Sequence, residues 1–240
     1  MKHQVALITG ASRGLGKTLA HFLALQGFEL ILTARRADAL CATAVALEAL
    51  GTRVIALPGD IQDAAHQQQL AAAVASFGRL DLLVNNASLL GPSPQPQLAS
   101  YPLATLTEIY AVNVLAPLGL IQRVLPWLQR AGGLVVNISS DAAVGGYAGW
   151  GGYGSSKAAL DLLSLTLANE LRTEGVAVVA VDPGDMQTAM HQAAFPGEDI
   201  SDRPLPEVTI PFWAWLLGQA PLTVTGQRFQ AQATTWSVPD

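Results

Sequence analysis

Short apolar segments alternate with longer amphipathic segments along most of the chain. The first apolar run, VALIT at residues 5–9, is followed by a group of glycines and then by apolar residues at helical spacing. The same order is repeated down the chain. We therefore predict strands within residues 5–9, 28–36, 53–61, 79–91, 133–140 and 176–186, a last strand within 223–236, and a helix after each of the first five.

This alternation of strands and helices predicts an α/β fold with a doubly wound, mostly parallel sheet of about seven strands. A length of 240 residues suits one domain, 1–240, better than two small ones. Ligands of such sheets bind at the carboxyl ends of the strands. We therefore expect a single site where the loops that follow the strands meet.

Composition narrows the classes of partner. Half of the residues are hydrophobic, only 13% are charged, and the net charge is −5 with no basic run, so nucleic acid and anionic membranes are not expected partners. Cys41 is the only cysteine, which excludes an intrachain disulfide and favours a reducing compartment. The first apolar run is short for a signal peptide, and we read no membrane span in the sequence. We expect a soluble cytoplasmic protein.

The segment TGASRGLG directly follows the first strand. Gly10, Gly14 and Gly16 lack side chains, so the backbone there can approach a pyrophosphate at the N-terminus of the next helix. The cluster alone could also be a bare turn. The strand before it and the helix after it favour the phosphate-binding interpretation.

The end of the second strand predicts the choice of dinucleotide. NAD-preferring proteins usually carry an acidic residue there for the ribose hydroxyls, whereas this chain has Ala34, Arg35 and Arg36. A guanidinium suits a phosphate monoester, and Arg13 in the glycine turn can approach the same group. We therefore expect NADP(H) to be preferred over NAD(H). The alternative is that the two arginines only solvate a loop.

Two further strand ends carry polar side chains with open roles. Asp60 follows the third strand, where its carboxylate can accept from an adenine amino group or cap the next helix. Asn85 and Asn86 end the fourth strand, where paired amides can fix a turn or contact a ligand.

Asn113 lies inside the long helical segment 103–132, four residues before Pro117. Proline cannot donate to the Asn113 carbonyl, so a kink and a freed carbonyl are expected. A water held there can relay protons to Lys157. A simple bend for packing is the alternative.

The segment from Ser140 to Lys157 carries the candidate chemistry. Tyr153 and Lys157 are four apart in a predicted helix and therefore lie on one face. Tyrosine is a poor base at neutral pH unless a nearby positive charge stabilises the phenolate, and an ammonium one turn away provides that charge. The Ser140 hydroxyl, at the end of the fifth strand, can polarise the same substrate oxygen.

A substrate lid is predicted at residues 186–206, a segment punctuated by proline and glycine after the sixth strand. Several apolar residues can line a pocket beneath it or serve ordinary packing, and no metal site is expected. They are Leu90, Tyr147, Trp150, Met190 and Phe195. Core or interface packing is expected for Trp213 and Trp215, and no role is assigned to His191.

Taken together, TGASRGLG, NNA at 85–87, Asn113, the Ser-Tyr-Lys set and PGDMQT resemble the short-chain dehydrogenase/reductases over nearly the whole chain. The resemblance implies a single Rossmann-like domain, with Tyr153 as acid/base, Lys157 lowering its pKa and holding the nicotinamide ribose, Ser140 placing the carbonyl, and Asn113 supporting a water relay. It also implies cofactor contacts from Gly10, Ser12, Arg13, Gly14, Leu15, Gly16, Arg35, Asp60, Ile61, Asn86, Ala87, Pro183, Gly184 and Thr188.

Three features depart from the family pattern. Ser88 stands where glycine usually follows NNA, and Asp141 directly follows the active serine. Asp141 can repel anionic substrates or attract a cation, but a role as a loop cap is the favoured interpretation. The last strand lacks the usual Asp-Gly-Gly, which leaves the oligomer contact open, although a homodimer or homotetramer is expected.

The sequence therefore predicts an NADP(H)-dependent oxidoreductase that interconverts a medium-sized, partly apolar carbonyl compound and its alcohol. A non-catalytic dinucleotide sensor on the same fold is one alternative. It would keep the glycine turn and lose Ser140, Tyr153 or Lys157, all of which are present. A structural subunit is the other, since the apolar composition allows a broad apolar face.

Overall fold

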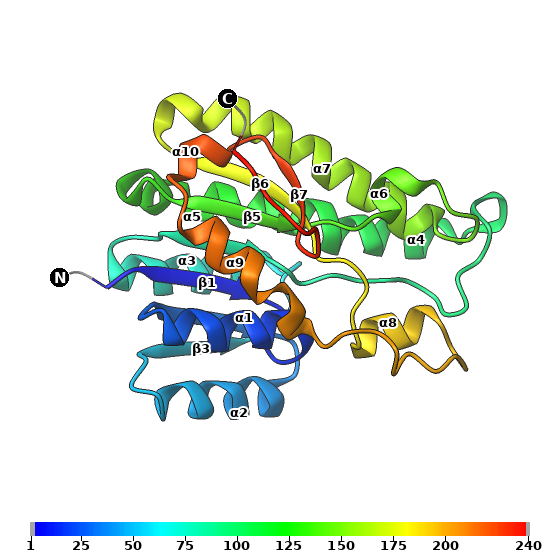
Figure 1. Ribbon diagram of the computed structural model, residues 1–240, viewed down its shortest axis with the longest axis horizontal. Helices are drawn as coiled ribbons and strands as arrows, with labels where there is room; N and C mark the ends of the chain where they lie inside the picture. The colour runs from blue at the N-terminus through cyan, green and yellow to red at the C-terminus, as the bar shows by residue number, and fades with distance from the viewer. Residues whose placement is uncertain (1–2, 239–240) are drawn as a thin grey trace.

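Seven strands form one sheet in the order β3-β2-β1-β4-β5-β6-β7 (Figure 1). Every pairing in this computed structural model, which describes residues 3–238, is parallel. The predicted doubly wound sheet is confirmed, and it is parallel throughout. The strands are β1 (Val5–Thr9), β2 (Glu29–Ala34), β3 (Val54–Pro58), β4 (Leu82–Asn85), β5 (Leu134–Ile138), β6 (Ala177–Asp182) and β7 (Arg228–Gln230).

Helices cover both faces of the sheet, as Figure 1 shows. Residues 1–2 and 239–240 of the predicted domain lie outside the described residues. The helices are α1 (Gly14–Leu25), α2 (Ala37–Glu48), α3 (Ala64–Phe77), α4 (Leu103–Tyr110), α5 (Ala116–Ala131), α6 (Ala142–Gly145), α7 (Gly151–Leu171), α8 (Ala189–Ala194), α9 (Ile210–Leu217) and α10 (Pro221–Val224).

The strands are apolar at successive positions because both of their faces are buried. In β1, Ala6 and Ile8 pack into a core shared with α1, α2 and α9, whereas Val5 and Leu7 pack into a second core shared with α3, α5 and α7. Side chains alternate between the two faces of a strand, so a strand covered on both sides needs apolar residues throughout. This explains why the strands read as continuous apolar runs.

The long helical segment is irregular where a kink is predicted. A π turn, Ala111–Leu115, joins α4 to α5, and Pro117 stands at the start of α5. The ring of Pro117 excludes a hydrogen bond to Asn113, and the wider turn accommodates the missing donor. Asn113 is placed inside this turn and is buried.

The segment Leu103–Ala131 is long and apolar enough, by length and composition, to cross a membrane. This corrects the expectation that the sequence contains no such segment. In the structure its apolar side chains Leu120, Ile121, Val124 and Leu128 are buried in the core against the sheet. Packing on the sheet accounts for the hydrophobicity of these positions.

An aromatic cluster packs α9 against the edge strand β7 and the C-terminal segment. Phe212 in α9 is fully buried, and its ring centroid lies 5.1 Å from Trp213, 5.7 Å from Phe229 and 5.4 Å from Trp236. Trp213 is buried as well, and Trp215 packs against the same core. Core packing is therefore the role of the two tryptophans within this chain.

Phe212→Ala should lower the free energy of unfolding by about 3–5 kcal/mol, because it removes a buried ring from between several others. Urea unfolding of the variant measures the loss. Leu25→Ala, at a side chain that is 61% exposed, is the matched control and should change stability by less than about 1 kcal/mol. Equal effects at the two positions would contradict the assignment.

Candidate active site

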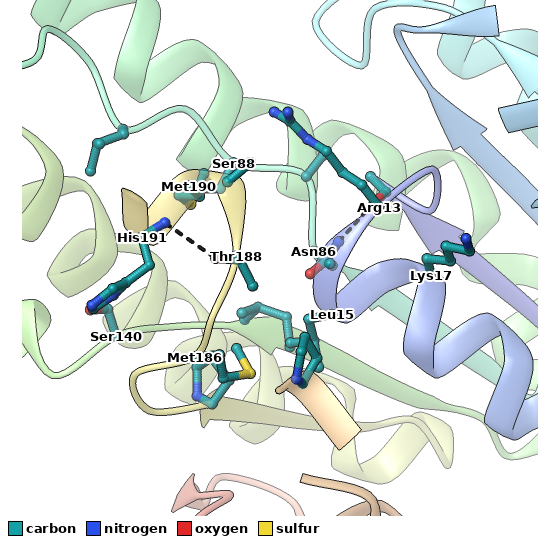
Figure 2. A pocket seen from close by; sticks show the side chains of 18 of the residues that line it. Arg13, Leu15, Lys17, Asn86, Ser88, Ser140, Met186, Thr188, Met190 and His191 are labelled. Atoms are coloured by element: carbon teal, nitrogen blue, oxygen red, sulfur yellow. Dashed lines mark hydrogen bonds between the residues drawn. The ribbon is translucent and has the colours of Figure 1, made fainter. Parts of the chain in front are cut away.

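A cavity of about 920 Å³ lies at the carboxyl edge of the sheet (Figure 2). Gly16 and Asn113 are the two predicted site residues that do not line it. The others do: Gly10, Ser12, Arg13, Gly14, Leu15, Arg35, Asp60, Ile61, Asn86, Ala87, Ser140, Tyr153, Lys157, Pro183, Gly184 and Thr188.

The glycine turn is held by the side-chain amide of Asn86. Its Nδ2 donates to the carbonyl of Thr9 at 2.8 Å and to that of Gly10 at 3.3 Å. A Cβ at Gly16 would lie 2.5 Å from both Asn86 Nδ2 and the Gly10 carbonyl, so only glycine fits there. The absence of a side chain at Gly16 thus makes room for Asn86, whose hydrogen bonds hold the turn in place.

The N-terminus of α1 faces the cavity. Arg13 occupies its N-cap position without a side-chain capping bond, so the first amide groups of the helix have no side-chain acceptor from the cap. Gly14, with φ 52°, follows it, and a Cβ there would lie 3.5 Å from Thr188 Cγ2 across the cavity. The turn and Thr188 therefore enclose a narrow space at a positively polarised helix end.

Cationic side chains surround this end of the cavity. Arg13, Arg35 and Arg36 line it together with Lys17, which sequence reasoning had not singled out. Figure 2 shows Arg13 and Lys17 on either side of the glycine turn. This half of the cavity is suited to phosphate groups.

Asp60 does not cap α3. Its carboxylate accepts from the backbone amide of Gln62 at 3.0 Å, whereas Asp63 caps the helix by accepting from the Ala65 amide at 2.8 Å. The capping alternative belongs to Asp63. Asp60 lines the cavity, and its contact with adenine stays a prediction.

Asn85 has a structural role, distinct from that of its neighbour Asn86. Its Nδ2 donates to Asn137 Oδ1 at 2.8 Å, and Asn137 Nδ2 donates in turn to Ser164 Oγ at 2.8 Å. These buried groups satisfy one another between β4, β5 and α7. The bonds tie the strand that precedes Ser140 to the helix that carries Tyr153.

The side chain of Asn113 braces α7, the helix that carries Tyr153. Its Nδ2 donates to Ser156 Oγ at 2.9 Å and to the Leu89 carbonyl at 3.0 Å, and its Oδ1 accepts from the Leu89 amide at 2.8 Å. Ser156 itself donates to the carbonyl of Tyr153 at 2.6 Å. The side chain is thus committed to holding the cavity wall. The proton relay through a water stays a prediction.

Ser140 is held by its neighbour. Its hydroxyl donates to Asp141 Oδ1 at 3.0 Å and accepts from the Ala142 amide at 3.2 Å. Asp141 makes no side-chain capping bond to α6, so the favoured loop-cap interpretation is wrong. The carboxylate instead orients the serine hydroxyl and adds a negative charge to the cavity wall.

Tyr153 and Lys157 lie on one face of α7, with Lys157 Nζ 5.6 Å from the centroid of the tyrosine ring. Burial raises the pKa of Tyr153 to about 12, although hydrogen bonds with Ser88 and Ser140 oppose the shift. The expected lowering of this pKa is therefore not found. Burial is the largest cause of the shift, and Lys157 Nζ donates to the carbonyl of Ile138 at 2.7 Å.

A backbone hydrogen bond joins the two ends of the predicted lid. The amide of Gln187 donates to the carbonyl of Pro204 at 2.8 Å, and Thr188 Oγ1 caps α8 by accepting from the His191 amide at 3.2 Å (Figure 2). The intervening segment, which includes α8, therefore lies along the cavity and contributes lining residues to it. Its opening and closing stay a prediction.

Aromatic side chains pack between the predicted lid and α7, the helix that carries Tyr153. The ring centroid of Trp150 lies 6.0 Å from Tyr153 and 5.8 Å from Phe195. Leu90, Trp150 and Met190 line the cavity, as predicted for pocket residues. Phe195 and Tyr147 are not among the lining residues. Phe195 packs against Trp150, and Tyr147 is 49% exposed.

His191 is a cavity residue that sequence reasoning missed. Its ring lies 4.8 Å from that of Phe195, its Nδ1 is 3.7 Å from Asp185 Oδ1, and its Nε2 has no hydrogen-bond partner among the described residues. His191 lies in the short helix α8, and the sequence there shows no periodicity that would indicate where its side chain points. Its place in the wall depends on the fold of the lid.

Lys157→Met should remove a pH dependence of folding stability. Burial lowers the pKa of Lys157 to about 8 from 10.5, so between these values the unfolded chain binds more protons than the folded one. The wild type should therefore gain stability relative to the variant as pH rises through this window, by on the order of 3 kcal/mol.

Urea unfolding of both proteins across that pH range measures the gain. Lys17→Met, which removes an exposed lysine from the same cavity, is the control and should retain the wild-type pH dependence. If the stability of the wild type and of Lys157→Met changed equally with pH, the lowered pKa of Lys157 would be contradicted.

Comparison with known proteins agrees with this geometry. Residues 4–199 match the family described as short chain dehydrogenase. Serine 3-dehydrogenase of Agrobacterium fabrum is 39% identical over 76% of this chain and 72% of its own length, and the uncharacterised oxidoreductase YciK of Escherichia coli K12 is 33% identical over 97% and 93%.

A solved short chain dehydrogenase of E. coli CFT073, complexed with NADPH, superposes with a TM-score of 0.89 at 32% identity, covering 97% of this chain and 98% of that one. The family match over residues 4–199 includes the glycine turn and the helix of Tyr153. The chain belongs to the short-chain dehydrogenase family and is an oxidoreductase of that family.

Proposed function

We propose that the protein is an NADP(H)-dependent oxidoreductase that interconverts a carbonyl compound and its alcohol. The observation that carries this proposal is the continuity of one cavity. Its cationic end adjoins the glycine turn, and its other end holds Ser140, Tyr153 and Lys157. A phosphate-binding half joined to an acid/base pair is what hydride transfer to or from a bound substrate requires.

The residues fit a dinucleotide. The missing side chain at Gly14 leaves room between the turn and Thr188, and the α1 N-terminus offers amide donors there. Arg13 and Arg35 would take a 2′-phosphate. The bound nicotinamide supplies or accepts the hydride.

Tyr153 would act as the proton donor in carbonyl reduction. A phenol with a pKa of about 12 is protonated at neutral pH, which is the form that reduction needs. Ser140 would hold the substrate oxygen beside it. The cationic form of Lys157, beneath the ring, would stabilise the phenolate left by proton transfer.

NADP(H) is favoured over NAD(H) by the cations at the end of β2 and in the glycine turn. Two solved neighbours, from Shigella flexneri and E. coli, are described as complexed with NADP and NADPH, which supports the same choice. The substrate would be a medium-sized, partly apolar carbonyl compound. The relatives are named for different reactions, a serine dehydrogenase and a 3-oxoacyl reductase among them, so they leave its identity open.

Tyr153→Phe should abolish turnover while leaving the Kd for NADPH unchanged, because it removes only the proton donor. Nicotinamide fluorescence measures binding, and a panel of ketones and aldehydes measures turnover. Tyr110→Phe, at a half-buried tyrosine that does not line the cavity, is the control and should keep activity. Turnover retained by Tyr153→Phe would refute its role. A wild type that binds NADPH and turns over no carbonyl would favour the sensor.

Arg35→Ala should raise the Kd for NADPH about tenfold to hundredfold and leave the Kd for NADH nearly unchanged, because a charge-assisted contact to phosphate is worth roughly 1.5–3 kcal/mol. Fluorescence titration with the two nucleotides measures the difference. Arg130→Ala, at an exposed arginine near the end of α5, is the control. Equal weakening for both nucleotides would show that Arg35 does not select the 2′-phosphate.

A further inference from the structure

Arg228 in the edge strand β7 joins three neighbouring segments. Its Nη2 donates to the carbonyl of Ser140 at 2.8 Å, and its Nε donates to Asp161 Oδ2 at 2.9 Å. The same Nη2 lies 3.4 Å from Asp182 Oδ2. Because β7 runs beside β6 (Figure 1), one side chain reaches the ends of both β5 and β6 and the middle of α7.

Each of these contacts lies next to a part of the active site. Ser140 carries the hydroxyl that faces the cavity, and Asp161 stands one helical turn after Lys157. Asp182 ends β6, lines the cavity and accepts from the amide of Gly184 at 3.0 Å. The guanidinium therefore connects the serine loop, the Tyr-Lys helix and the Pro-Gly turn.

Burial makes this connection difficult to replace. The side chains of Asp161 and Asp182 are only 17% and 5% exposed. Carboxylates with so little access to solvent need a cation as a bonding partner. Burial raises the pKa of Asp182, and Arg228 opposes this shift. Asp161 in turn raises the pKa of Lys157. Without Arg228, each of these two mostly buried carboxylates would lose its bonded cation.

An arginine suits this position better than a lysine. The planar guanidinium has five donors in a fixed fork, so it can bond a carbonyl and two carboxylates that lie in different directions. An ammonium is a compact charge that can approach one or two of these acceptors. The geometry of three acceptors on three segments thus calls for arginine.

We propose that Arg228 is a positioning residue of the active site, which sets the place of Ser140 relative to Tyr153 and Lys157. The proposal rests on the proposed function, since it gives the C-terminal strand a part in that chemistry. Arg228 does not line the cavity and acts through the residues it bonds.

The test compares Arg228→Met with Arg172→Met. Arg172 is a matched control because it also ties the end of the α7 segment to the C-terminal part of the chain, through the carbonyls of Leu222 and Thr225 at 3.4 and 3.5 Å. Neither Arg172 nor these two partners line the cavity. A general loss of anchoring of the C-terminal segment would affect both variants.

Hydrogen exchange of the cofactor-free protein is the first measurement, because it needs no substrate. The amide of Ala143 donates to the same Ser140 carbonyl, and those of Val144 and Gly145 donate to the Asp141 carbonyl. Arg228→Met should speed exchange across residues 142–146, and Arg172→Met should not. Equal exchange of this segment in both variants would overturn the proposal, whether or not a substrate is known.

Steady-state kinetics with a carbonyl that the wild type reduces is the second measurement. Arg228→Met should lower kcat about tenfold to hundredfold, as expected for a small displacement of reacting groups, with little change in the KM for NADPH. Arg228→Lys should recover part of kcat. A variant with wild-type kcat would overturn the proposal, whereas a wild type with no turnover would count against the proposed function alone.

Discussion

The parallel pairing of all seven strands is the constraint on which the site depends. Because every strand points the same way, the glycine turn, Asn86, Ser140 and the Pro183-Gly184 turn all leave the sheet at one edge. Helices must then return the chain along both faces, which buries the strands and makes them apolar. Most polar residues of the strands lie at or next to the strand ends. Core packing and site placement therefore have one cause.

Tyr153 and Lys157 owe the shifts of their pKa values to burial more than to each other. Both Tyr153 and Lys157 are buried, and burial favours the neutral form of each, raising the pKa of one and lowering that of the other. At neutral pH the phenol is therefore protonated, whereas the Lys157 ammonium, with a pKa of about 8, stays mostly charged. The protonated phenol is the form that the proposed reduction of a carbonyl requires.

Buried polar side chains keep this pair in register with the rest of the cavity. Asn113 links the segment after β4 to Ser156, one turn along α7 from Tyr153, and Asn137 links β5 to Ser164 in the same helix. These groups are satisfied by one another, so moving one of them would leave others unpaired in the interior. Their bonds limit how far α7 can shift relative to the sheet.

The sequence by itself determined the order of strands and helices, the glycine turn and the Tyr-Lys spacing. Each of these depends on residues close together in the chain, so periodicity and spacing reveal them. A local pattern also located the irregular turn near Pro117. The same kind of pattern could not separate a membrane span from a core helix in residues 103–131, since both are long and apolar.

Only the tertiary structure decided which polar groups meet. Asp141 could cap a helix or face the cavity, and its bond to Ser140 depends on how the loop folds back. His191 enters the cavity wall through the lid, and Arg228 reaches Ser140 across 88 residues of sequence. Contacts of this range leave no periodic trace in the chain. They arise from the way the strands pair, which brings distant residues together at one edge of the sheet.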